Sequence, residues 1–271
     1  MDEITMIQGL IRGPTSIILA GVHGDEPCGI EAFEAVLPLL RIQAGTVYFI
    51  VGNPLALKQR KRFADFNLNR AFRSPGSLRP EDVVSYEYSR AQFLMTYLDK
   101  ATALLDIHSS MTPGSIPFVI CENNGVGIAS YLPGDLIVTG FDTVSPGGTD
   151  EYMNRHNRIG ICIECGQHLD PHASTVAVSA IHAFLARRGH TMRTFPQIHK
   201  QRIKVFEMYR TKTDVFEHLY RWNDFAAVPK GAIIGIDGTE EIRAPKDSFI
   251  LFARDRSQVG TEAFLLAESV I

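Results

Sequence analysis

The stretch SIILAGVHGDEPCG, residues 16–29, sets the architecture, because an uninterrupted apolar run passes directly into a short polar turn. Residues 16–21 predict a buried strand, and residues 28–40 predict the helix that follows it. Gly21 and Gly24 would permit a tight backbone path between the two elements. A buried strand that feeds a helix in this way is typical of a βαβ unit.

The same alternation continues along the chain. Further apolar runs predict strands over residues 46–51, 103–108, 117–121, 136–139 and 159–165. Helical spacing of apolar residues predicts helices over residues 81–100 and 173–188, the second closed by Gly189. We therefore expect an α/β fold with helices on the faces of a central sheet.

The character of the sequence changes after about residue 190. Short alternating runs predict strands over residues 203–209, 232–237, 248–252 and 263–267, separated by turn residues. We therefore expect two domains, a catalytic domain over residues 1–195 and a small β-rich domain over residues 196–271.

The composition limits the classes of partner. The chain has 271 residues, a net charge of −3, 45% hydrophobic and 21% charged residues, which is typical of a globular protein. No basic cluster indicates a nucleic acid or an anionic membrane as partner, and no long uncharged apolar run indicates a membrane span. The acidic N-terminus does not resemble a signal peptide, so we expect a cytoplasmic protein with free thiols. The oligomeric state stays open, a homo-oligomer included.

Two segments combine into a predicted metal site. His23 and Glu26 lie three residues apart after the first strand, and His108 ends the apolar run of residues 103–108. Ligands gather at the carboxyl ends of strands in open α/β sheets, and imidazole and carboxylate suit zinc. Asp106 shares a strand face with His108 and could orient its ring. Each histidine alone could instead be structural, but together they favour a zinc ion with an open fourth position, which is the catalytic pattern.

Other polar residues are candidates for the chemistry. Glu164 lies in the apolar run of residues 159–165, where a carboxylate suits a general base, or else a pair with a core arginine. Residues 62–72, RFADFNLNRAF, bring Arg62, Asn69 and Arg70 together. Guanidinium groups suit carboxylates and oxyanions, although the segment could also be a solvated basic loop. Cys162 and Cys165 would point to opposite faces of a strand, which disfavours a redox pair.

Taken together, these motifs resemble the succinylglutamate desuccinylase/aspartoacylase family of zinc carboxypeptidase-like hydrolases. The matching pieces are GVHGDEPCG, Asn53-Pro54, FNLNRAF, DIHSS, the ECG around Glu164 and the C-terminal KGAIIGIDGTEEIRAPKDSFILF. The resemblance implies a mixed sheet flanked by helices and one Zn²⁺ per chain, held by His23, Glu26 and His108. It also implies that Glu164 is general base and acid, that Arg62 polarises the scissile carbonyl, and that Asn69 and Arg70 bind the carboxylate of a small N-acyl amino acid.

The resemblance is incomplete at the substrate end. The family pattern reads Asp-Leu-Asn-Arg, whereas this chain has Asn67 at the first position. A further substrate-binding arginine has no clear place, with Arg155 and Arg158 as candidates. We expect a zinc-dependent amidohydrolase acting on N-acyl amino acids. The alternatives are a carboxypeptidase or another amide or ester hydrolase on the same scaffold, and a non-catalytic metal-containing protein that binds small molecules.

Overall fold

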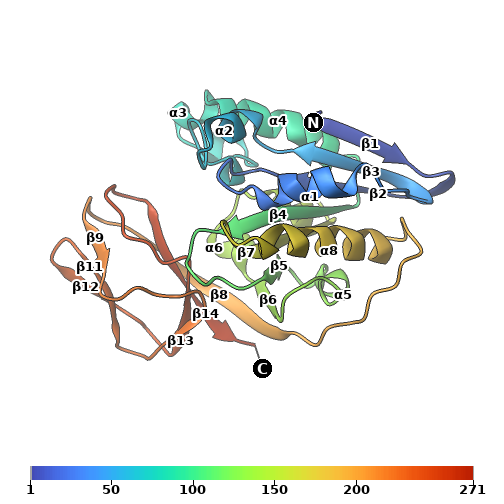
Figure 1. The fold of residues 1–271 in the computed structure, drawn as a ribbon. Coiled ribbons are helices and arrows are strands. Elements are labelled where there is room, and N and C mark those ends of the chain that lie inside the picture. The colour runs from blue at the N-terminus through green and yellow to red at the C-terminus, as the bar shows by residue number, and fades with distance from the viewer. Residues whose placement is uncertain (1, 271) are drawn as a thin grey trace.

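The computed structural model describes residues 2–270 (Figure 1). Within that range, eleven strands form one large mixed sheet in the order β1-β3-β2-β4-β7-β5-β6-β8-β14-β13-β10, and three form a small sheet in the order β12-β11-β9. The large sheet consists of β1 (Ile4–Gln8), β2 (Ile11–Ala20), β3 (Ala44–Val51), β4 (Ala103–Ser110), β5 (Phe118–Cys121), β6 (Leu136–Thr139), β7 (Ile159–Gln167), β8 (Gln201–Arg210), β10 (Ala226–Val228), β13 (Ser248–Leu251) and β14 (Glu262–Ser269). The small sheet consists of β9 (Phe216–His218), β11 (Ile233–Asp237) and β12 (Glu240–Arg243).

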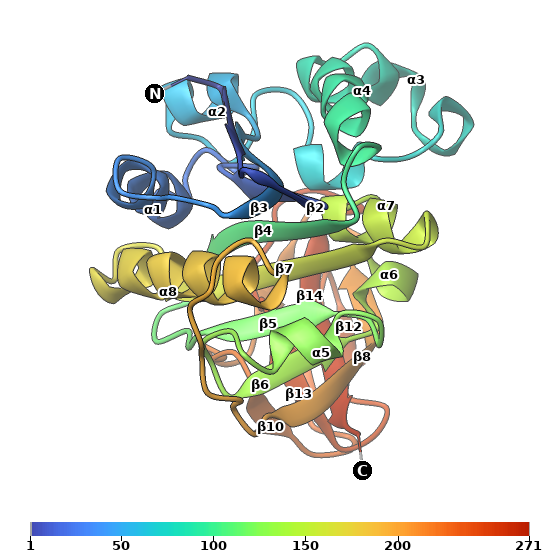
Figure 2. The same ribbon diagram turned by 90° about the vertical axis from the view of Figure 1, so that its right-hand side faces the viewer.

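Helices cover both faces of the large sheet (Figure 2). The α-helices are α1 (Cys28–Val36), α2 (Pro54–Gln59), α3 (Pro80–Val83), α4 (Tyr86–Leu98), α5 (Val126–Ala129), α6 (Phe141–Val144), α7 (Thr149–Arg155) and α8 (His172–Arg187). Short 3₁₀ turns, η1 (Leu68–Arg70) and η2 (Pro75–Ser77), lie between α2 and α3. The prediction of a mixed α/β fold flanked by helices is confirmed.

The central strands β3, β2, β4 and β7 run parallel to one another. One face of these strands packs on α1 and α8, and the opposite face packs on α4 and α7. The side chains alternate accordingly, with Ile18 in the first core and Ile17 in the second. Every residue of β4 is buried, because both faces of this strand are covered.

The helix predicted over residues 81–100 is wrong in its middle, where the chain forms two helices, α3 and α4. Ser85 has an extended backbone and begins α4, since its Oγ accepts a hydrogen bond of 3.1 Å from the Tyr88 amide. The same hydroxyl donates to the Asp82 carbonyl, 2.6 Å away. A serine in this position favours the start of a helix over its continuation, a signal that the apolar spacing concealed.

The C-terminal part continues the large sheet past the predicted boundary at residues 195 and 196. Strand β8 pairs parallel with β6 and antiparallel with β14, so it joins the two halves of the sheet. The four strands predicted after residue 196 all exist as β8, β11, β13 and β14. The three-stranded sheet lies apart from the helices, on the left of Figure 1. The division into two domains stays a prediction.

Asp224 joins the C-terminal part to the segment after β4. Its Oδ2 accepts hydrogen bonds from the Ser110 and Ser115 hydroxyls, at 3.3 and 2.8 Å. Its Oδ1 accepts one from the Phe252 amide, at 2.8 Å. A single carboxylate therefore fixes the C-terminal strands beside the carboxyl end of β4.

All four cysteines are free and buried. Cys162 and Cys165 belong to different hydrophobic cores, on opposite faces of β7, as the alternation of a strand requires. Among residues 2–270, no helix combines the length and the apolar character that crossing a bilayer would need.

Candidate metal centre and active site

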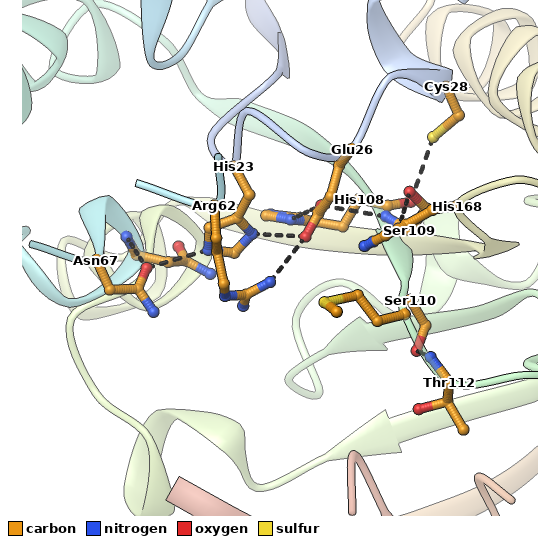
Figure 3. A network of polar contacts seen from close by, with 12 residues as sticks. His23, Glu26, Cys28, Arg62, Asn67, His108, Ser109, Ser110, Thr112 and His168 are labelled. Carbon is orange, nitrogen blue, oxygen red and sulfur yellow. Dashed lines mark hydrogen bonds and ion pairs between the residues drawn. The ribbon is translucent and has the colours of Figure 1, made fainter. Parts of the chain in front are cut away.

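His23, Glu26 and His108 converge at one edge of the large sheet (Figure 3). His23 and Glu26 lie on the turn between β2 and α1, and His108 lies near the end of β4. Because β2 and β4 are parallel neighbours, their carboxyl ends meet at this edge. His23 Nδ1 lies 2.7 Å from Glu26 Oε1, and His108 Nδ1 lies 2.8 Å from Glu26 Oε2. All three side chains are buried, with one donor atom of each within 4.8 Å of the others.

The turn that carries His23 and Glu26 requires glycine at two positions. Gly21 has a φ of +68°, in the left-handed region that glycine adopts without strain. Gly24 passes so close to α2 that a Cβ there would lie 2.1 Å from the Ala56 carbonyl carbon. The glycines therefore allow the turn to fold back against α2 while its side chains point toward β4.

Polar partners behind the two imidazoles orient the rings. His23 Nε2 lies 3.0 Å from Asn67 Oδ1, which can only accept a hydrogen bond. His108 Nε2 lies 3.2 Å from Asp106 Oδ2, an ion-pair distance without the alignment of a hydrogen bond. Asp106 is in turn fixed by the Thr149 hydroxyl. Acceptors behind Nε2 favour the proton on that nitrogen and leave the Nδ1 lone pairs directed at the centre of the site, as metal-binding histidines require.

The charges of the site also suit a cation. Burial alone would raise the pKa of Glu26, but His23 and His108 hold it well below its usual value, so this carboxylate is ionised. Burial and the Arg62 charge lower the pKa of His23, which favours its neutral form. Burial would lower the pKa of His108, but Cys162, Asp106 and Glu26 raise it well above its usual value, so this imidazole must release a proton when a metal binds. Two imidazoles and one ionised carboxylate match the donor set of a catalytic zinc site.

Glu164 lies beside the three side chains. It pairs in register with His108 across the parallel strands β7 and β4. Its Oε2 is buried and makes no hydrogen bond within residues 2–270, and no arginine of that range forms an ion pair with it. Burial, followed by the charge of Glu26, raises the pKa of Glu164 to about 8. A carboxyl group of this kind can both accept and return a proton near neutral pH.

The site lies at the base of a pocket of about 860 Å³. Arg62, Asn69 and Arg70 all line this pocket, together with Glu164. Arg62 Nη1 donates to Glu26 Oε1 over 3.1 Å, and Asn69 Oδ1 accepts from the Thr149 amide over 3.4 Å. Arg70 makes two hydrogen bonds of 2.8 Å to the carboxylate of Glu262, on β14. The predicted residues are therefore gathered in one place, although Arg70 already has a carboxylate partner.

Arg155 and Arg158, the candidates for a further substrate-binding arginine, do not line the pocket. Arg155 donates to the Phe72 carbonyl over 3.0 Å. Arg158 donates to the Leu98 carbonyl and to Asp99, over 3.0 and 2.9 Å. Both arginines connect elements of the fold and do not face the site.

Sequence reasoning missed the pocket residues that come from distant elements. Asp150, in the first turn of α7, lines the pocket, as do Arg254 and Arg256 in the segment between β13 and β14. The best sequence signal for Arg254 was its position, two residues after the strand predicted over residues 248–252. Nothing in the sequence says that this strand end faces the carboxyl ends of β2 and β4.

Comparisons with known proteins point to one family. The model of the succinylglutamate desuccinylase/aspartoacylase catalytic domain matches residues 12–186. The succinylglutamate desuccinylase of Shewanella woodyi is 27% identical over 284 residues, which cover 94% of this chain and 82% of that protein. A solved structure of succinylglutamate desuccinylase from Vibrio cholerae has a TM-score of 0.80 at 19% identity, over 95% of this chain and 82% of that chain. The product-bound ectoine utilization protein of Ruegeria pomeroyi has a TM-score of 0.76 at 17% identity, over 99% and 88% of the two chains. At these identities the two structures show likeness of fold alone.

Proposed function

The chain belongs to the succinylglutamate desuccinylase/aspartoacylase family, and from this premise we propose that it is a zinc-dependent amidohydrolase acting on small N-acyl amino acids. The two enzymes that give the family its name, succinylglutamate desuccinylase and aspartoacylase, are named as enzymes that remove acyl groups by hydrolysis. The observation that carries the finer proposal is the convergence of His23, Glu26 and His108 beside Glu164, at the base of one pocket.

We propose that His23, Glu26 and His108 hold the zinc ion. The fit is supported by the two Nδ1 atoms directed at the ionised Glu26 carboxylate, and by the acceptors behind both rings. When bound, zinc supplies a Lewis acid that polarises a carbonyl oxygen and makes water a better nucleophile at neutral pH.

The chain's own residues would carry the protons and hold the substrate. Glu164 accepts a proton from the water that adds to the amide carbon, because its Oε2 is directed into the site without a partner. Arg62 stabilises the negative charge that develops on the carbonyl oxygen. Glu164 then delivers the proton to the leaving nitrogen as the C–N bond breaks. The products are a carboxylic acid and a free amino acid.

Asn69 and Arg70 remain the proposed residues for the substrate's amino-acid end. Both line the pocket, and an amide beside a guanidinium suits a carboxylate. Because Glu262 already occupies Arg70, a substrate carboxylate would share that guanidinium with it.

The experiment is a hydrolysis screen of N-acyl amino acids with zinc-loaded protein, read as release of the free amino acid. We expect turnover by the wild type and a loss of about 10²-fold to 10⁴-fold in Glu164→Gln, with zinc retained. Glu34→Gln, an exposed glutamate on α1, is the matched control and should hydrolyse normally. Near-normal turnover by Glu164→Gln would refute its role as the base.

Two further outcomes decide between the alternatives. Trimming of peptide C-termini without hydrolysis of N-acyl amino acids would favour a carboxypeptidase. Binding of N-acyl amino acids without turnover would favour a non-catalytic protein. For the metal, we expect about one zinc per chain in the wild type and none in His23→Ala or His108→Ala. Full zinc occupancy in both variants would contradict the ligand assignment.

A further inference from the structure

Six arginines line the pocket, and they differ in whether a carboxylate already neutralises them. Four have such a partner: Arg62 with Glu26, Arg70 and Arg210 with Glu262, and Arg79 with Asp82. Within residues 2–270, no carboxylate lies at ion-pair distance from the other two, Arg254 and Arg256.

The two unpaired arginines are not equivalent. Arg256 Nε donates to the Glu262 carbonyl, and its backbone pairs with Phe216, so this residue serves the C-terminal strands. The side chain of Arg254 makes one hydrogen bond within residues 2–270, from Nη1 to Met111 Sδ over 3.4 Å. A thioether is a weak acceptor, so most of the donors of this guanidinium remain without a strong partner.

The position of Arg254 is nevertheless fixed from two sides. Its amide donates to the Ala263 carbonyl over 2.8 Å, which anchors it between β13 and β14. Met111, which its guanidinium contacts, belongs to the segment directly after β4. Arg254 is therefore held at the junction of the C-terminal strands with the edge that carries His108.

The surroundings of Arg254 are those of an anion site. Burial lowers the pKa of Arg254 because it disfavours the charged form, and repulsion by the Arg62 guanidinium lowers it further. Glu26, Glu164 and Asp224 act in the opposite direction and partly offset this effect, although none of them lies at ion-pair distance from Arg254. Asp224 is already engaged by the Ser110 and Ser115 hydroxyls and the Phe252 amide. Glu26 and Glu164 have other proposed tasks, in metal binding and proton transfer. Burying a guanidinium without a counterion costs free energy, and an anionic ligand would remove part of that cost by supplying the negative charge.

We propose that Arg254 binds a carboxylate group of the substrate through a two-point contact, and that it thereby selects substrates with an anionic end. This inference rests on the proposed function and deepens it by naming the group that requires the anion. Arg254 would then add an uncommitted guanidinium to Arg70, which Glu262 already engages with both oxygens. The C-terminal strands would complete the substrate site.

The test uses succinate, a small dicarboxylate, as the probe for binding to the zinc-loaded full chain, measured by calorimetry. We expect Arg254→Gln to weaken binding about 10-fold to 100-fold, because a charge-assisted contact is lost. The succinate affinity of Arg254→Lys should lie between those of the wild type and Arg254→Gln, since lysine keeps the positive charge but loses the two-point contact of the guanidinium. Arg243→Gln, an exposed arginine on β12 with the same change of charge, is the matched control.

A stability measurement separates binding from a structural role. Removal of an unpaired cation should leave the thermal midpoint of Arg254→Gln unchanged or higher, whereas loss of a structural arginine would lower it. Once a substrate is identified, Arg254→Gln should raise KM more than it lowers kcat. Equal succinate affinity in wild type and Arg254→Gln, or no succinate binding by the wild type, would overturn the inference. If succinate binding depends on Arg254 but no N-acyl amino acid is hydrolysed, the proposed function fails and the carboxylate site stands.

Discussion

Asn67 shows how one residue can keep a structural role while its charge changes. The family pattern has a carboxylate at this position, and here an amide oxygen takes its place behind His23, 3.0 Å from Nε2. The same oxygen accepts a hydrogen bond of 3.0 Å from the Asn69 amide and begins the 3₁₀ turn η1. The amide therefore retains the orientation of the ring and of Asn69, and it removes one negative charge from beside the pocket.

The role of Asn67 predicts a graded effect on zinc binding. Asn67→Ala should weaken zinc affinity about 10-fold to 100-fold, because His23 loses the acceptor that orients its ring. Asn67→Asp keeps an acceptor and should bind zinc at least as tightly as the wild type. The measurement is a chelator competition titration, with the unfolding midpoint of each metal-free variant as control for folding. An Asn67→Ala variant that binds zinc like the wild type would contradict this orienting role.

Helix α1 shows how close packing between elements positions the proposed metal ligands. Gly29, in the first turn of α1, faces β2 and β4, where a Cβ would lie 2.7 Å from Ala20 Cβ and 3.1 Å from Ile107 Cγ2. The absence of a side chain lets the start of α1 approach the sheet. Glu26, three residues earlier, is thereby brought within reach of His108.

Gly29→Ala should therefore destabilise the protein, even though alanine is the better helix former. Overpacking of this kind typically costs about 2 kcal/mol, more than the roughly 1 kcal/mol gain in helix propensity, and a contact as short as 2.7 Å cannot be kept without a shift of the helix. Gly127→Ala is the matched control, since Gly127 is also helical and a Cβ there has nothing within 4 Å. Urea unfolding measures both variants. The packing explanation fails if Gly29→Ala is as stable as Gly127→Ala.

Across the whole molecule, Glu262 connects the C-terminal strands to the N-terminal part of the chain. It lies on β14 and holds Arg70, 192 positions earlier, by two hydrogen bonds of 2.8 Å, and it also holds Arg210 at 2.9 Å. Burial alone would raise the pKa of Glu262, but Arg70 and Arg210 lower it from 4.5 to about 2. This part of the pocket wall is thus an ion-pair network that requires both η1 and the C-terminal strands to be in place.

This network predicts a pH dependence of stability. Because the pKa of Glu262 is lowered on folding, its contribution is fully present above the unfolded value of 4.5 and is lost as the pH falls toward about 2. The metal-free wild type should lose more unfolding free energy between about pH 5 and pH 3 than Glu262→Gln does. Denaturant unfolding with a chelator present measures both proteins without the effect of zinc. If the unfolding free energies of the two proteins fell in parallel with pH, the ion pairs of Glu262 would contribute nothing to stability.

Local patterns were enough to predict much of this molecule. The apolar runs before His23 and through His108 predict the strands β2 and β4, because a buried parallel strand needs apolar residues on both faces. Their order along the chain places both histidines and Glu164 at strand ends, which is why the predicted metal site could be assembled from the sequence. At Ser85 the apolar spacing gave a wrong prediction. The spacing continues through this residue as if one helix ran over residues 81–100, but the Ser85 hydroxyl begins a new helix, α4.

The substrate end of the pocket was decided by the tertiary structure alone. That Glu262 occupies Arg70 and that Arg254 faces the site follow from contacts between residues far apart in the sequence. From the sequence, Arg155 and Arg158 were equally good candidates for a substrate-binding arginine. In the structure, both donate hydrogen bonds to backbone carbonyls outside the pocket. The sequence by itself predicted the α/β class, most of the strands, the candidate metal ligands and the candidate base, because apolar periodicity and motif spacing are local properties. Only the folded chain decided which arginines are neutralised and which one remains free, because charge pairing depends on distances in space.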